Sequence, residues 1–165
     1  MIIANMAGKT LGIIGLGRIG EAVAMRAKAF GMNIIYNKRS RLPASVEDEL
    51  GVTFEPDIDR LVARSDIITL HCPSTPQSRQ MLNAESFAKM KTGAILVNLA
   101  RGDLVETPAL VAALQSGKLA GAALDVCEME PATTHKLFGH ENVVVSPRLG
   151  ASTGDAQETG AVQVA

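Results

Sequence analysis

The chain has 165 residues, 47% of them apolar and 20% charged, and its formal net charge is -1. This length suffices for one globular domain with a substantial core. The near-neutral charge excludes an overall positive electrostatic potential that would attract nucleic acid or an anionic membrane. With 4 Phe, 1 Tyr and no Trp, the chain also lacks the residues of a base-stacking surface. No apolar run reaches the roughly 18 residues of a membrane helix, and no signal peptide is evident, so we expect a cytoplasmic protein.

Aliphatic runs alternate with helical patterns along the chain. A strand at 11–15 ends in a glycine-rich turn, and apolar residues at helical spacing follow over 18–30. The same patterns predict strands at 33–36, 52–54, 66–70, 94–98, 121–125 and 142–146, and helices at 46–50, from 58 onward, and at 85–90, 107–115 and 152–165. Such alternation predicts an α/β fold of the Rossmann type: a doubly wound, mainly parallel sheet with helices on both faces, forming one domain over 1–165.

The first predicted turn carries the sequence GLGRIG at 15–20. Gly15 permits a tight turn from strand to helix, Gly17 lets a pyrophosphate approach the backbone, and Gly20 lets the helix pack closely on the strand. The helix N-terminus offers free N–H groups and a partial positive charge, to which Arg18 adds a full one. Since this glycine pattern follows a strand and opens a helix, it predicts a dinucleotide site.

The residues after the second strand bear on which dinucleotide is bound. About 20 residues after the glycine turn, at the end of the second strand, many such folds have an acidic residue that binds the ribose 2′-OH of NAD. Here the position is Asn37, and Lys38, Arg39 and Arg41 follow it. A neutral amide beside three cations attracts a 2′-phosphate that an acid would repel, so we expect NADP to be preferred over NAD. The alternative is a solvated loop whose charges serve solubility.

Several further motifs occur in order along the chain: HCP at 71–73, NLARG at 98–102, DVCEMEP at 125–131 and NVVVSPRLG at 142–150. With these and the glycine turn, the chain resembles the cofactor-binding domain of the D-isomer-specific 2-hydroxyacid dehydrogenases. Its loop at 36–43 is most similar to the glyoxylate, hydroxypyruvate and sugar-acid reductase branches. The resemblance implies hydride transfer between a nicotinamide cofactor and a pair of 2-hydroxy and 2-oxo acids, carried out by a homodimer.

The resemblance also implies catalytic roles for Arg101 and Glu130. Arg101 would hold the substrate carboxylate and carbonyl with its planar fork, and Glu130 would raise the pKa of a histidine that donates a proton to the substrate. Taken alone, an arginine such as Arg101 would be a surface cation about as often, and Glu130 would more often be a solvated loop acid. Cofactor contacts are implied for Ile19, His71, Cys72, Pro73, Leu99, Ala100, Asp125 and Gly150, with Asp125 binding the carboxamide unless it merely caps a turn.

Neither cysteine is expected to form a disulfide, bind zinc or act as a nucleophile. Cys72 and Cys127 lie far apart and form no CxxC motif, so no disulfide framework or zinc site is predicted. Without a base beside it, Cys72 is better interpreted as a small buried residue than as a nucleophile.

The chain departs from the family pattern at Arg148. The family has its acid–base histidine there, and arginine remains protonated at any working pH, so we expect hydride transfer to be impaired by about 100-fold or more. The other histidines do not replace it, because His71 belongs to the cofactor loop and His135 and His140 precede the last strand.

A second departure concerns the substrate domain. About ten residues precede the first strand, so we expect this chain to be truncated and to lack the separate substrate domain that family members carry.

Two alternatives to a dehydrogenase therefore stay open. One is a non-catalytic dinucleotide-binding module, used as a sensor or for interaction. The other is an S-adenosylmethionine-dependent methyltransferase, which the pyrophosphate-suited turn and the basic loop disfavour.

Overall fold

The computed structural model describes residues 5–126, 137 and 139–146. Their strands are β1 (Thr10–Ile14), β2 (Asn33–Asn37), β3 (Val52–Phe54), β4 (Ile67–Leu70), β5 (Ala94–Asn98), β6 (Leu119–Leu124) and β7 (Val143–Val145). The helices are α1 (Arg18–Ala29), α2 (Ala44–Leu50), α3 (Ile58–Arg64), α4 (Ala84–Lys89) and α5 (Thr107–Gln115), with a short 3₁₀ helix, η1, at Gly102–Leu104. The strands form one sheet in the order β3-β2-β1-β4-β5-β6-β7, and every pairing in it is parallel.

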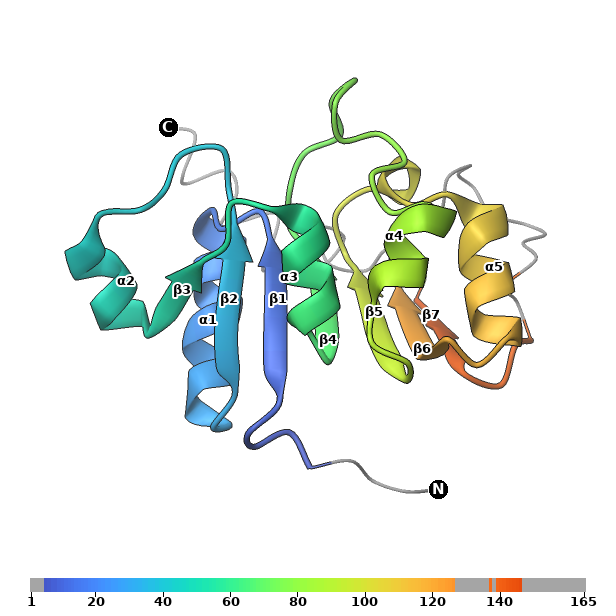
Figure 1. Cartoon of the computed structure of the whole chain (residues 1–165), viewed down its shortest axis with the longest axis horizontal. Helices are drawn as coiled ribbons and strands as arrows, with labels where there is room; N and C mark the ends of the chain where they lie inside the picture. The colour runs from blue at the N-terminus through green and yellow to red at the C-terminus, as the bar shows by residue number, and fades with distance from the viewer. Residues whose placement is uncertain (1–4, 127–136, 138, 147–165) are drawn as a thin grey trace, which may run out of the picture.

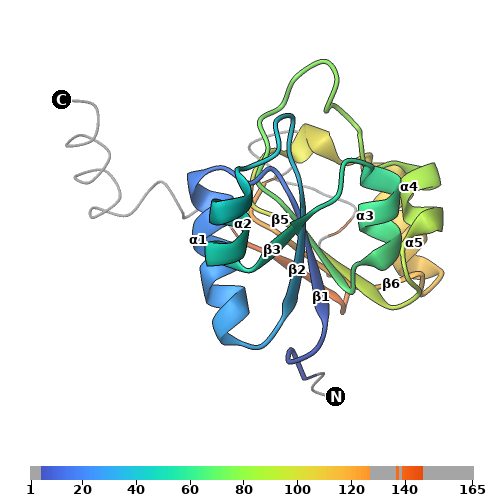
Figure 2. The ribbon, with the colours of Figure 1, turned by 60° about the vertical axis from the view of Figure 1, so that its left-hand side comes forward.

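Helices cover both faces of the sheet. Helices α1 and α2 lie on one face, and α3, α4 and α5 lie on the other (Figures 1 and 2). This arrangement confirms the predicted α/β, doubly wound fold. The observed bounds agree with the predicted ones to within two residues, and those of β3, β5 and α5 are identical. Helix η1 was not predicted, and the helix predicted at 152–165 lies outside the described residues.

Two apolar clusters hold the layers together. Ile13 and Ile14 are neighbours in β1, yet they belong to different clusters because successive side chains of a strand point to opposite faces. On the face of α1, Ala24 and Ala27 are buried, and their small size lets this helix lie close to the sheet. The other face is filled mainly by aliphatic side chains, as the low aromatic content requires.

The strand order reverses between β1 and β4, which are neighbours although β2 and β3 separate them along the chain. In open parallel sheets, ligands bind outside the carboxyl ends of the strands at such a point. Main-chain hydrogen bonds draw the departing loops together there: Gly15 N–H donates to Asn37 O (2.9 Å), and His71 N–H donates to Ile14 O (2.8 Å). The fold therefore brings the glycine turn, Asn37 and His71 to one place.

Neither a membrane span nor a metal cluster occurs in the described ranges. No helix in them is long and apolar enough to cross a membrane. Nor do the residues in these ranges gather three or more His, Cys, Asp or Glu side chains in a group that could hold a metal ion.

Candidate dinucleotide site

The three glycines of the first turn have different surroundings. Gly15 has φ +97°, and a Cβ there would lie 2.6 Å from the backbone nitrogen of Cys72. A Cβ on Gly20 would lie 2.5 Å from the carbonyl oxygen of Gly15. A Cβ on Gly17 would meet no described atom within 4 Å. Gly15 and Gly20 are therefore required by the protein's own packing, whereas Gly17 leaves open a space that a side chain would fill.

The turn presents the start of α1 to solvent. Leu16 is fully buried and anchors the turn in the core, while Gly17, Arg18 and Ile19 are exposed. The first N–H groups of a helix have no partner within the helix, and Gly17, the N-cap of α1, supplies no side chain to bind them. Free N–H groups beside an open space suit a pyrophosphate, so the turn fits the cofactor that its sequence predicts.

A hollow of about 740 Å³ runs from this turn along α1. It is lined by Gly17, Arg18, Ile19, Ala22, Val23, Arg26 and His71. The imidazole Nε2 of His71 lies 2.9 Å from the hydroxyl of Thr69, and burial lowers the pKa of His71. The ring is therefore neutral at physiological pH and adds no charge beside Arg18.

Cys72 follows His71 and is only partly buried. Its thiol lies 4.0 Å from the sulfur of Met81, and burial raises its pKa. A thiol with a raised pKa is a poor nucleophile. Cys72 is thus less buried than expected from the sequence, and its raised pKa disfavours a role as a nucleophile.

The loop after β2 is fastened at its beginning by Asn37. The amide nitrogen of this residue donates to the carbonyl oxygens of Glu55 (2.9 Å) and Pro56 (3.0 Å). Both amide hydrogens are thus used within the protein, and the amide oxygen remains for another donor. Lys38 is half-buried and Arg39 is exposed, and neither has a hydrogen bond or an ion pair with any other part of the described chain.

The third predicted cation of this loop is already paired. Arg41 binds Glu47 side-on, with its Nε 3.0 Å from one carboxylate oxygen and its Nη2 2.8 Å from the other. The guanidinium also lies 5.7 Å from the ring centroid of Phe54. Of the three cations predicted to attract a 2′-phosphate, one therefore has a carboxylate partner inside the protein.

Arg101 stands just beyond the end of β5. The side chain of Asn98, which is only 1% exposed, accepts a hydrogen bond from Ala100 N–H (3.1 Å) and donates one to Arg101 O (2.8 Å). These bonds fold residues 98–101 into a tight loop. The guanidinium of Arg101 is exposed, and its contact in this loop is a hydrogen bond from Nη1 to Ala100 O. Asn98 thus fixes the backbone from which Arg101 projects.

Asp125 lies at the end of β6, next to this loop. Its N–H donates to Asn98 O (3.0 Å), and its carboxylate accepts a hydrogen bond from the hydroxyl of Ser146. Ser146 follows β7, so the carboxylate is oriented from a neighbouring strand end. The loops after β5, β6 and β7 are therefore joined by hydrogen bonds at the same edge of the sheet.

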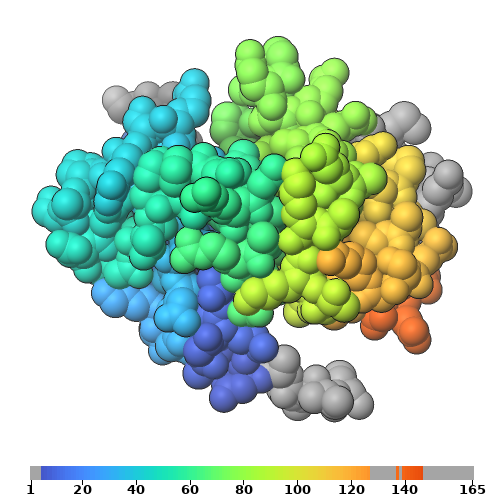
Figure 3. Space-filling view, in the orientation of Figure 1, coloured from blue at the N-terminus to red at the C-terminus, as the bar shows by residue number. Residues whose placement is uncertain are grey.

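The loop between β4 and α4 rises above this edge (Figures 1 and 3). Asp103 of η1 ties it down: its carboxylate accepts a hydrogen bond from Ser74 (2.6 Å) and pairs with Arg79 (3.5 Å), and its carbonyl oxygen accepts from Gln80 N–H (2.8 Å). A parallel bridge between Leu82 and Val105 continues the contact. The segment that contributes His71 is in this way joined to the segment that contributes Arg101.

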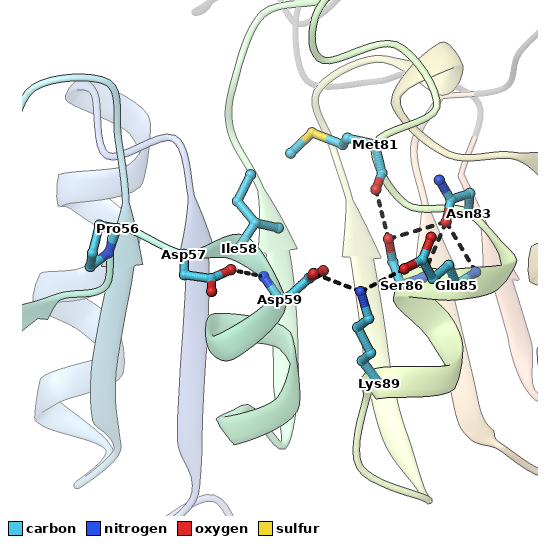
Figure 4. Close-up of a pocket in the computed structure, with 9 residues that line it drawn as sticks. All are labelled: Pro56, Asp57, Ile58, Asp59, Met81, Asn83, Glu85, Ser86 and Lys89. Carbon is cyan, nitrogen blue, oxygen red and sulfur yellow. Dashed lines mark hydrogen bonds and ion pairs between the residues drawn. The ribbon is translucent and has the colours of Figure 1, made fainter.

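A second hollow, of about 630 Å³, lies between the beginnings of α3 and α4 (Figure 4). Lys89 spans it, with its ammonium 2.6 Å from Asp59 and 2.9 Å from Glu85, and these carboxylates raise the pKa of Lys89. Asn83 caps α4 at the rim. The charged groups named here are satisfied by one another, so this hollow is a junction of two helices and contains none of the predicted site residues.

The structure thus brings together Gly15, Gly17, Arg18, Ile19, Gly20, Asn37, His71, Cys72, Pro73, Leu99, Ala100, Arg101 and Asp125 at the carboxyl edge of the sheet. Glu130, Gly150 and Arg148 lie outside the described residues. Tyr36, Glu47 and Asp103 were not identified from the sequence. Tyr36 could have been noticed, because a buried tyrosine hydroxyl usually needs a partner.

The chain is similar to known proteins over almost its whole length. Residues 1–150 match the family model for the NAD-binding domain of D-isomer-specific 2-hydroxyacid dehydrogenases. Glyoxylate reductase from Thermococcus onnurineus is 51% identical over 96% of this chain and 47% of its own length. D-3-phosphoglycerate dehydrogenase from Methanocaldococcus jannaschii is 49% identical over 96% of this chain and 30% of its own length. The chain therefore spans about half, or less, of these relatives.

Solved structures agree with this similarity. A glyoxylate reductase from Paecilomyes thermophila matches with a TM-score of 0.92 and 41% identity, over 99% of this chain and 49% of the other. D-mandelate dehydrogenase from Rhodotorula graminis matches with a TM-score of 0.90 and 33% identity, over 94% of this chain and 45% of the other.

Proposed function

The chain belongs to the D-isomer-specific 2-hydroxyacid dehydrogenases, whose NAD-binding domain it forms, and we propose that it serves the reduction of small 2-oxo acids with NADPH as the preferred cofactor. Residues 1–165 act as one dinucleotide-binding domain in this proposal. Glyoxylate and hydroxypyruvate are the candidate substrates, since the similar proteins include glyoxylate reductases. A cytoplasmic homodimer, which the resemblance implies, belongs to the same proposal.

The observation that carries the cofactor preference is the loop after β2. It begins with a neutral amide, Asn37, followed by Lys38 and Arg39, which have no partner elsewhere in the described residues. A carboxylate at the first position would repel a 2′-phosphate, whereas two cations without partners can form charge-assisted hydrogen bonds to it. The pyrophosphate would lie at Gly17 and the first turn of α1, where the open space and the free N–H groups are.

On the substrate side, the proposal relies on Arg101 and Asp125. When bound, the reduced nicotinamide supplies a hydride. The exposed guanidinium of Arg101 would hold the substrate carboxylate through two parallel hydrogen bonds, on a backbone that Asn98 fixes. The carboxylate of Asp125, oriented by Ser146, would accept a hydrogen bond from the nicotinamide carboxamide.

Glu130 and Arg148 complete the proposal from the sequence alone. Glu130 corresponds to the family's acid beside the catalytic histidine, but Arg148 stands where that histidine is expected. An arginine can stabilise a developing alkoxide but cannot deliver a proton at neutral pH. Slow turnover is therefore part of the proposal. Arg148 also favours a second candidate function, a dinucleotide-binding module without catalysis.

Binding titrations with NADPH and NADH test the proposal. We expect NADPH to bind at least about tenfold more tightly, because a hydrogen bond to a charged group contributes about 1.5–3 kcal/mol. The preference should shrink as salt is raised from about 0.01 to 0.5 M, since exposed charges are screened. Equal affinities would refute the NADPH preference. Oxidation of NADPH with a panel of 2-oxo acids separates a slow reductase from a module with no activity.

A further inference from the structure

The loop that carries Lys38 and Arg39 is held at both ends. Asn37 fastens its beginning to the backbone of Glu55 and Pro56. Its far end, at residues 41–42, is fastened by a separate set of contacts that the proposed function does not use. Residues 38–40 span the distance between these two attachments.

Two side chains from outside the loop make the far attachment. Tyr36 is fully buried, and its hydroxyl donates to Glu47 (2.6 Å) while accepting a hydrogen bond from Leu42 N–H (2.9 Å). Glu47 of α2 is only 6% exposed, and both of its carboxylate oxygens accept from Arg41. Buried Glu47 thus holds the side chain of Arg41, and buried Tyr36 holds the main-chain N–H of the next residue, Leu42.

We propose that Tyr36 and Glu47 are positioning residues for recognition of the cofactor's 2′-phosphate, acting by holding the far end of the loop so that Lys38, Arg39 and Ser40 face the ribose. This inference rests on the proposed function. Arg41 then serves as a structural link between Glu47 and the loop and does not bind the phosphate itself.

The geometry of the ion pair supports this division of roles. Glu47 occupies the Nε and Nη2 edge of Arg41, which is the edge best suited to two parallel hydrogen bonds with an oxyanion. To bind the phosphate by that edge, Arg41 would have to leave a buried carboxylate without its partner, which is unfavourable. Lys38 and Arg39 have no such competing acceptor in the part of the chain that the structure describes.

The test uses Tyr36→Phe, Glu47→Gln and Arg41→Gln in the whole 165-residue chain. Affinities for NADPH, NADH and 2′,5′-ADP are measured by titration, and the folding of each variant is checked by thermal unfolding without ligand. We expect each variant to bind NADPH and 2′,5′-ADP about tenfold more weakly, within the range of coupling energies for residues of one network. Binding of NADH should change less than about twofold, since it has no 2′-phosphate for the loop to contact.

Glu55→Gln is the matched control. Glu55 is 7% exposed and pairs with an exposed arginine, Arg64, at 2.9 Å, as Glu47 does with Arg41. The substitution keeps the main-chain carbonyl of Glu55 that accepts from Asn37, and the Glu55 side chain has no hydrogen bond or ion pair with residues 38–42 in the described part of the chain. This variant should leave the ratio of NADPH to NADH affinity unchanged, although it removes a similar ion pair.

Four results would overturn the inference. Tighter NADPH binding by Glu47→Gln would mean that Glu47 only cancels the charge of Arg41, and equal weakening of both cofactors would mean a general loss of structure. Additive losses in the Glu47→Gln, Arg41→Gln double variant would mean that Arg41 binds the phosphate directly. If Glu47→Gln fails to fold, the same comparison of cofactors is made with Tyr36→Phe. The fourth result that would overturn the inference is an unmodified chain that binds no nicotinamide cofactor, and this result would refute the proposed function as well.

Discussion

Replacing each glycine of the first turn by alanine should separate the residues that fold the turn from the one that admits the cofactor. The three substitutions add the same methyl group within six residues of chain, so composition and solubility hardly change. Only the surroundings of the new Cβ differ. At Gly15 and Gly20 it meets backbone atoms, and at Gly17 it meets open space.

The expected losses of stability follow from these surroundings. Gly15→Ala places a non-glycine residue at φ +97°, at about 1–3 kcal/mol for a sparsely populated backbone region. Its Cβ, 2.6 Å from backbone, adds an overpacking cost of about 1–3 kcal/mol. A total near 3 kcal/mol lowers the unfolding midpoint by about 6–12 °C in a chain of this size. Gly20→Ala should cost less, about 1–2 kcal/mol, because alanine's helix propensity offsets part of the clash.

Gly17→Ala should hardly change stability. Gly17 has an extended backbone that alanine adopts readily, and the cost of a poorer N-cap is offset by the lower entropy of the unfolded chain, leaving about 0.5 kcal/mol or less. Its methyl group, however, would occupy the space proposed for the pyrophosphate. We expect NADPH affinity to fall by about tenfold or more, since overpacking costs about 1–3 kcal/mol.

Urea and thermal unfolding of the ligand-free variants, with NADPH titration of each folded protein, would measure both effects. At the same concentration, NADPH should raise the unfolding midpoint of the unmodified chain more than that of Gly17→Ala. A loss of stability in Gly17→Ala as large as that in Gly15→Ala would contradict the open surroundings of Gly17. NADPH binding by Gly17→Ala as tight as that of the unmodified chain would contradict the placement of the pyrophosphate at this residue.

Two more predictions concern the charged residues Asp66 and Arg148. Burial raises the pKa of Asp66, but the hydrogen bond from Thr10 N–H and the ion pair with Lys91 outweigh it, so that the pKa is lowered overall. A lowered pKa stabilises the fold above the unfolded-state value of about 3.9, and this contribution is lost as pH falls through the folded-state pKa. The urea midpoint of Asp66→Asn should therefore fall less steeply than that of the unmodified chain between about pH 6 and about pH 3. Arg148→His, in the chain joined to the substrate-domain segments of the Thermococcus onnurineus relative, should raise glyoxylate-dependent NADPH oxidation by about 100-fold, and an unchanged rate would contradict the role assigned to position 148.

The strands and helices were largely predictable because hydrophobic periodicity and glycine positions define them locally. Strand β5 is one uninterrupted aliphatic run, and its bounds were predicted correctly. Strand β6 begins at Leu119, two residues before the predicted start at Gly121. The pairing with β5 shifts register between Ala94 and Ile95, and this irregularity extends the strand across a segment that its own sequence does not mark as strand.

The polar contacts of the site were less predictable, since they join residues from separate segments. Glu47 has the sequence context of an exposed helix residue, yet it is buried because the only tyrosine of the chain and Arg41 both reach it. Arg41 was accordingly predicted as a phosphate ligand from its charge and position. A pattern of charges in sequence shows which groups could meet an anion, but not which of them already has a partner in the fold.

The two attachments of the loop after β2 also bear on how such a protein can change. Residues 38–40 connect Asn37 to the anchored pair at 41–42. They lie between β2 and α2, and their side chains have no hydrogen bond or ion pair with the part of the chain that the structure describes. In our proposal these three residues form an exchangeable insert. A switch in cofactor preference could then be acquired in one or two mutational steps while the sheet, the glycine turn and the Arg101 loop stay as they are.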